Sequence, residues 1–251
     1  MKESTAEAGT EKNLDKPLNL DVIDMIIGIV GAHPEIAVVF LGQPQTNVPL
    51  LGRSDLLPLD RDLIRTAWRQ CSESGLPLWD TVMLLLSRAD QIYDTILNQA
   101  MVHRGISTTQ FSVMSDAFAP KIRELSESKP PEQMLAMCSK VQLKKGTTEH
   151  IPMMDFRCPV SPHSLQLVST IAKLFDVGKG FIVETDRSYH FYGSELLTEQ
   201  EWLKFLGRAL QFSPIVDRAW IAHQLIDLCC NLRIAPRRPD GKELRVVAVV
   251  G

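Results

Sequence analysis

The sequence has no long hydrophobic run, no internal repeat and no excess of charge of one sign. The best candidate for a membrane span, Val22 to Val39, is interrupted by Asp24 and by His33-Pro34-Glu35, so a transmembrane helix is not expected. A net charge of -3 over 251 residues excludes a protein that coats nucleic acid through an overall positive potential. Local basic patches remain compatible with phosphate binding.

Cysteine is scarce, and its number is odd. The five residues are scattered apart from one adjacent pair, and they are Cys71, Cys138, Cys158, Cys229 and Cys230. Such a set does not predict a secreted disulfide framework, so we expect reduced thiols and a cytoplasmic protein. The cysteines and histidines also lack the repeated close pairs of a structural zinc site.

Composition is otherwise that of an ordinary globular protein, with 45% hydrophobic and 23% charged residues. Residues 1–17 are polar, without the apolar core of a signal peptide, and we expect a disordered lead. The polar, proline-bearing stretch Ser126–Pro131 marks a boundary. We therefore predict a helix-rich N-terminal module over 18–130 and a second module over 131–251.

Hydrophobic periodicity defines the main elements of the N-terminal module. Asn19 or Asp21 is expected to cap an amphipathic helix, and the β-branched run Ile36–Leu41 predicts a buried strand. Asp60 is expected to cap another helix. Apolar residues at three- and four-residue steps predict one long helix from Leu78 to about His103.

The second module follows a strand-helix-strand-strand-helix-strand order. Alternation predicts hairpins over 138–157 and 181–192, a helix follows Ser161-Pro162, and Thr198 begins another with a capping box. Such an order places its strands side by side in one antiparallel sheet. The fold class is therefore α+β, with a helix-rich module packed on an RRM-like antiparallel sheet module.

Three short motifs fall at matching points of this pattern, namely Asp155, Ser188-Tyr189-His190 and Asp217. On a strand, Asp155 and Arg157 point to the same face, and Ser188 shares a face with His190. Carboxylates suit a divalent cation, while a hydroxyl and an imidazole can bind phosphate oxygens. This pattern favours a site for phosphoryl chemistry.

Each of these residues also has a structural interpretation. Asp155 can be a sheet-edge acid that pairs with Arg157 or a neighbouring lysine, His190 can be a half-buried strand residue, and Asp217 can be the N-cap of a helix. A basic tract downstream consists of Arg233, Arg237, Arg238, Lys242 and Arg245. It fits either phosphate contacts or a solvated turn.

The order of these motifs resembles the archaeo-eukaryotic primase superfamily, the catalytic core of primase-polymerases. Its motifs are two acids separated by one residue on a strand, a Ser-any-His triplet on a hairpin, and an acid after a hydrophobic residue. Asn231–Pro236 is similar to the basic strand that follows them. The resemblance covers roughly Lys140 to Val250. Arg157 stands where the family has its second acid, as in divergent bacterial primase-like proteins with a single aspartate.

The resemblance implies a primase-like catalytic core that binds nucleotides and DNA or RNA. Asp155, His190 and Asp217 would be catalytic, with Mg²⁺ or Mn²⁺ on the two aspartates of an active enzyme. Ser188, His190 and Arg233 would bind the nucleotide, and Arg237 and Arg238 the nucleic acid.

Arg157 favours an alternative, a catalytically inactive primase-like subunit. It would be an interaction or regulatory module of a bacterial mobile-element or phage-defence system, with protein partners. The residues leave open which of the two applies, and hence whether the chain is a nucleotidyltransferase.

Overall fold

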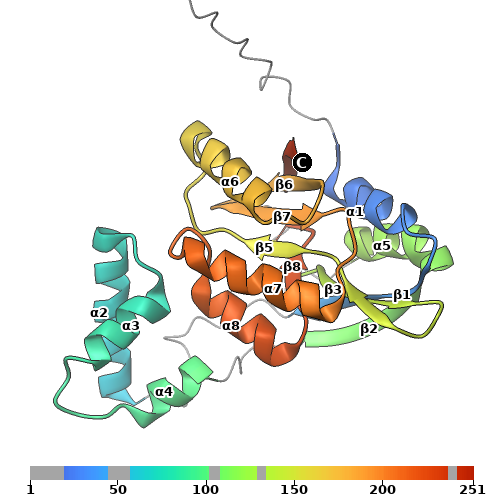
Figure 1. Ribbon diagram of the computed structural model, residues 1–251. Helices are drawn as coiled ribbons and strands as arrows, with labels where there is room; N and C mark the ends of the chain where they lie inside the picture. Colours follow the sequence, from blue (N-terminus) through green and yellow to red (C-terminus); the bar gives the residue numbers. More distant parts are fainter. Residues whose placement is uncertain (1–19, 45–56, 102–107, 129–133, 237–241) are drawn as a thin grey trace, which may run out of the picture.

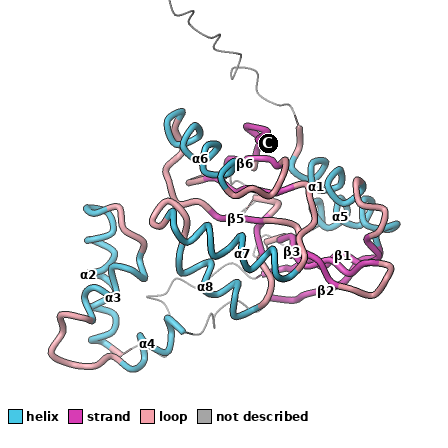
Figure 2. The backbone as a smooth tube through the Cα atoms, in the orientation of Figure 1, coloured by secondary structure: helices cyan, strands magenta, loops and turns pink. Residues whose placement is uncertain are grey.

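Two antiparallel sheets and the helices around them form the main body, in a computed structural model that describes residues 20–44, 57–101, 108–128, 134–236 and 242–251. Figures 1 and 2 show the sheets side by side, with α2, α3 and α4 to one side of them. The fold class is α+β, as predicted. The lead segment 1–17 lies outside the described residues. Within them, no helix is long and apolar enough to span a bilayer.

The first sheet joins strands from both halves of the chain. Its order is β2-β1-β3-β4, and β8 pairs with β3. The strands are β1 (Ile36–Pro44), β2 (Thr108–Met114), β3 (Ala136–Leu143), β4 (Thr148–His150) and β8 (Asn231–Arg233). The predicted buried strand at Ile36 is therefore present. Since β1 pairs with both β2 and β3, this sheet crosses the expected boundary near residue 131.

The second sheet holds most of the candidate site. Its order is β5-β7-β6-β9, with β5 (Met153–Asp155), β6 (Gly180–Glu184), β7 (Tyr189–Gly193) and β9 (Arg245–Val250). The prediction of a single sheet was wrong. The returning strand of the first hairpin divides, so that β4 stays with β3 whereas β5 pairs with β7. Pro152, which lacks an N–H donor, lies in the break between them.

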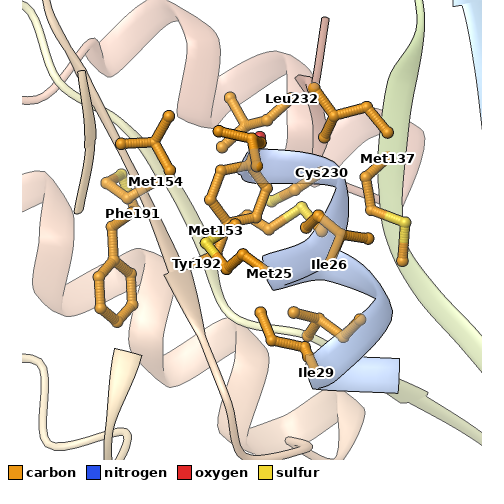
Figure 3. Close-up of a cluster of buried hydrophobic side chains, with 14 of the residues drawn as sticks. Met25, Ile26, Ile29, Met137, Met153, Met154, Phe191, Tyr192, Cys230 and Leu232 are labelled. Carbon is orange, nitrogen blue, oxygen red and sulfur yellow. The ribbon is translucent and has the colours of Figure 1, made fainter. Parts of the chain in front are cut away.

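Helix α1 (Val22–Gly31) fills the space between the sheets. Asp21 is its N-cap and accepts the N–H of Ile23 at 2.7 Å, as the sequence predicted. Figure 3 shows α1 side chains among residues of both sheets, namely Met25, Ile26, Ile29, Met137, Met153, Tyr192 and Leu232. All seven are buried. Burial on this scale, at about 25 cal/mol per Å² of apolar surface, fixes the sheets relative to each other.

The opposite face of the second sheet is covered by α6 (Pro162–Leu174) and α7 (Glu199–Ala209). Phe175 follows α6 and packs edge-to-face on Phe191 of β7 and on Phe205 of α7. Helix α5 (Phe118–Ser128) contacts α1 and β2, after a short 3₁₀ turn over Ser115–Ala117. A second 3₁₀ turn, Leu210–Phe212, leads from α7 toward α8 (Arg218–Asp227).

Helices α2 (Pro58–Ser74), α3 (Leu78–Leu86) and α4 (Asp94–Met101) have a small core of their own around Ile64, Ala67, Val82 and Ile96. The predicted long helix from Leu78 to His103 was wrong. The polar stretch 87–93 forms a turn, which lets Val82 and Ile96 face the same core. Asp60 is also not the N-cap of α2; it lies in the first turn and accepts the N–H of Leu57 at 2.9 Å.

Cysteine pairing differs from the expectation of reduced thiols. Cys138 of β3 and Cys229 are paired as a disulfide, with a Cα–Cα separation of 6.4 Å. The pairing of Cys138 with Asn231 in the sheet brings these cysteines together although 91 residues separate them. The spacing of the cysteines in the sequence does not predict that Cys138 pairs with Cys229.

His150 is buried where β4 meets α7. Its ring stacks on Trp202 with a centroid separation of 4.4 Å. Its Nδ1 lies 3.2 Å from Oγ of Ser139, which also accepts the N–H of Cys230. Burial, with a smaller contribution from Lys140, lowers the pKa of His150 to about 4. The imidazole is therefore neutral in the folded protein at neutral pH.

We predict that this histidine weakens the fold in acid. Below the unfolded pKa of about 6.5, the unfolded chain binds a proton that the folded chain excludes until the pH approaches 4. The free energy of unfolding should therefore fall by about 2 kcal/mol between pH 7 and pH 4.5 from this group alone. Urea denaturation of the wild type and of His150→Phe measures it. An equal pH dependence in both proteins would contradict the assignment.

Candidate functional site

Asp155 and His190 face each other across the β5–β7 pair. The two residues are in direct register, and Asp155 Oδ1 lies 3.7 Å from His190 Nε2. The Asp155 side chain is 29% exposed and that of His190 is 6% exposed. By strand alternation both share the inner face with Met153 and Tyr192, toward the first sheet. On this face the Asp155–His190 pair therefore follows the buried Met153–Tyr192 pair, and the carboxylate of Asp155 reaches solvent.

Asp217 reaches the same place from a third segment. Phe156 and Val216 form an antiparallel bridge, and the N–H of Asp217 approaches the carbonyl of Asp155 at 3.4 Å. The structural interpretation of Asp217 is confirmed, since it is the N-cap of α8 and its Oδ1 accepts the N–H of Trp220 at 3.1 Å. The three candidate catalytic residues therefore lie on three neighbouring segments, with the edge strand β5 between β7 and the segment that ends in Asp217.

Arg157 lies on the same edge, two residues after Asp155. Its N–H donates to the carbonyl of Ile215 at 2.7 Å, which continues the pairing of the two segments. Its guanidinium donates from Nη1 to Asp217 Oδ2 at 3.4 Å. The ion pair that the sequence suggested between Arg157 and Asp155 is replaced by one with Asp217.

Ser188 lies in the turn that precedes β7. Its N–H donates to Thr185 Oγ1 at 3.1 Å, and its carbonyl accepts from the same hydroxyl at 3.1 Å. These bonds close the turn between β6 and β7. The half-buried Ser188 side chain is thereby held at the end of the hairpin that presents His190.

Arg233 joins the first sheet to this hairpin. Its guanidinium, with only 9% of the side chain exposed, forms an ion pair with Asp186 of the turn. Its carbonyl accepts the hydroxyl of Tyr192 at 3.0 Å. Asp186 lies two residues before the Ser-any-His triplet, and its partner lies 47 residues away in sequence, so no local pattern predicts this ion pair.

In the downstream basic tract, two residues bind an acidic side chain of the fold and two others lie outside the described residues. Glu184 of β6, which is buried, accepts from Lys242 Nζ and from Arg245 Nη2, both at 2.6 Å. Burial raises the pKa of Glu184, but its two cationic donors outweigh that effect and leave the pKa lowered. Lys242 and Arg245 are thus engaged in the fold. Arg237 and Arg238 lie outside the described residues, so their predicted role in nucleic-acid binding stays a prediction.

The contacts of the site residues determine whether the site can hold a metal ion. Primase-like domains are generally metal-dependent. No group of three or more His, Cys, Asp or Glu suited to a metal ion occurs among the described residues. Both oxygens of Asp217 have donors, namely Arg157 and the N–H of Trp220. The described side chains therefore do not fit a pair of protein-held metal ions.

Comparison with known proteins gives one match. A family model described as AEP-like, archaeo-eukaryotic primase 1D-like, matches residues 115–245, just over half of the chain. The matched segment contains every residue of the candidate site. No curated protein and no solved structure matches the chain.

We predict that the two contacts of Asp217 can be separated by mutation. Asp217→Ala removes the N-cap and should lower the free energy of unfolding by about 1 kcal/mol. Asp217→Asn keeps a good capping side chain and loses only a partly exposed ion pair, so its cost should be below about 0.5 kcal/mol. Chemical denaturation of both variants measures the difference. Equal losses would show that the ion pair with Arg157, and not the cap, stabilises this segment.

Proposed function

Because the chain belongs to the AEP-like family of archaeo-eukaryotic primase 1D-like proteins, we propose that it binds a nucleoside triphosphate where Asp155, His190 and Asp217 meet. Membership of the family indicates a primase-like function related to nucleotides or nucleic acid. The observation that carries the proposal is the register of Asp155 with His190 at the solvent-accessible end of the inner face.

The proposed roles follow from the chemistry of each side chain. The hydroxyl of Ser188 and the imidazole of His190 hydrogen-bond the phosphates, and Arg233 adds a cationic donor from the opposite sheet. Asp155 accepts Mg²⁺ or Mn²⁺ that arrives with the nucleotide. Arg237 and Arg238 are proposed to contact a nucleic-acid strand.

A second candidate function rests on Arg157. A guanidinium bound to Asp217 replaces the acid that the family has at this position. This favours a primase-like subunit that binds nucleotide but does not polymerise, and that acts as an interaction or regulatory module. Nucleotide binding is common to both candidates, whereas extension of an oligonucleotide belongs to an enzyme alone.

We predict that nucleotide binding depends on the facing pair of the second sheet. With Mg²⁺ present, Asp155→Asn should weaken binding of a fluorescent ATP analogue by about tenfold because the metal ion loses a carboxylate ligand, and His190→Gln should do so by about tenfold because the phosphate loses one charge-assisted hydrogen bond. Mn²⁺ with ATP should also raise the melting temperature of the wild type, and Asp155→Asn should remove that increase.

The matched controls are Asp176→Asn and His163→Ala, since both side chains are exposed and lie outside the strands that carry the site. They should bind the analogue like the wild type. Absence of binding to the wild-type chain would overturn the proposal. Extension of a labelled primer by the wild type, abolished in Asp155→Asn, would establish a nucleotidyltransferase and exclude the non-catalytic subunit.

We predict the opposite effect for Asp186→Asn. Asp186 occupies the guanidinium of Arg233, so a phosphate must compete with this carboxylate. Removing its charge should tighten binding of the ATP analogue several-fold, because Arg233 then loses a competitor. Asp176→Asn is the control, since it removes the partner of Arg208 elsewhere. Weaker binding by Asp186→Asn would show that the Asp186–Arg233 pair holds the site together and does not compete with the ligand.

A further inference from the structure

Arg157 is the residue that distinguishes this site from a metal centre with three carboxylates. Asp155, Asp217 and residue 157 lie on two segments whose pairing is fixed by the Phe156–Val216 bridge and by the bond from Arg157 N to the carbonyl of Ile215. An acid at position 157 would complete a group of three carboxylates. Arginine there leaves two carboxylates and a guanidinium.

The contacts of the guanidinium show what it does to Asp217. One terminal nitrogen donates to Oδ2, while Oδ1 accepts the N–H of Trp220. A cation that used Asp217 would have to displace the guanidinium or lie beside its positive charge. Both arrangements oppose binding of a metal ion, because the fixed charge repels it and the carboxylate oxygens are already engaged.

The guanidinium also has capacity to bind a ligand. A guanidinium has five N–H donors in a planar fork, and the contact with Asp217 uses one terminal nitrogen. The Arg157 side chain is 36% exposed, so solvent and a ligand can reach it. Planar donors of this kind match phosphate oxygens.

We propose that the Arg157 guanidinium takes the place of one metal ion in this site, by balancing Asp217 and binding a phosphate oxygen of the nucleotide. This inference rests on the proposed nucleotide site and adds how that site uses a divalent cation. The free protein then has no metal centre on Asp217. Any divalent cation enters with the nucleotide, at Asp155.

The first experiment titrates the full-length protein with Mn²⁺ alone and counts bound ions by electron paramagnetic resonance. The wild type should bind no ion that depends on Asp217. Arg157→Asp creates the three-carboxylate group and should bind Mn²⁺ at least about tenfold more tightly than the wild type. Arg157→Gln, which removes the charge without adding an acid, should not gain that affinity.

A matched control is Arg123→Asp, since Arg123 is also an exposed arginine with an acidic partner, Asp24 at 2.6 Å, and lies on α5 away from the site. It should leave Mn²⁺ binding unchanged. Position 157 is exposed, and circular dichroism of each variant checks that it folds. Two Mn²⁺ ions on the wild-type chain, one of them lost in Asp217→Asn, would overturn the inference without any variant at position 157.

The second experiment measures binding of the fluorescent ATP analogue with EDTA and with Mg²⁺. Arg157→Gln should weaken binding about tenfold in EDTA, while Arg157→Lys should keep part of the affinity because it keeps the charge. Unchanged affinity in Arg157→Gln would refute phosphate binding by this residue. If the wild type binds no nucleotide at all, the proposed function fails, whereas the Mn²⁺ titration still decides whether Arg157 excludes the metal.

Discussion

The candidate site depends on the pairing of β5 with β7 in one register. Asp155 lies opposite His190, and the two residues before it in β5, Met153 and Met154, are buried and point to opposite faces of the sheet. A slip of one residue would turn Asp155 toward the aromatic layer around Phe175 and would bring Met154 to the polar end. Burial of both faces therefore specifies the geometry on which every proposed role rests.

The β5–β7 pair packs against the apolar space between the two sheets. Helix α1 places Met25, Ile26 and Ile29 in that space, among buried residues of both sheets. Tyr192, fully buried, donates to the carbonyl of Arg233 and ties the two sheets together beside the site. The N-terminal helix, outside the segment matched by the family model, thus helps to define the site.

Charged side chains in and near the candidate site are arranged in pairs. Arg157 binds Asp217 and Arg233 binds Asp186, while Glu184 of β6 binds Lys242 and Arg245. In the proposed complex a phosphate would compete with Asp186 for Arg233, whereas Arg157 would keep Asp217 and use its remaining donors. Such exchange suits a site that binds phosphate selectively, because a neutral ligand cannot replace a carboxylate.

Much of the local structure was predictable from the chain. The cap at Asp21, the strand at Ile36 and the hairpin over 181–192 that carries His190 all rest on neighbouring residues, whose propensities act locally. The division of β4 from β5 and the break after Leu86 were missed. Both features depend on the hydrophobic core in which the apolar residues after the break are buried. Segments distant in sequence form that core.

The sequence by itself determined the motifs, their order and the replacement of an acid by Arg157, because these are properties of residue type and spacing. Only the tertiary structure decided that Arg157 holds Asp217, that Asp186 holds Arg233, and that two sheets carry the site. Ion pairs between residues 60 and 47 positions apart depend on how the strands pair and the sheets pack. Those arrangements minimise exposed apolar surface over the whole chain, which no local pattern records.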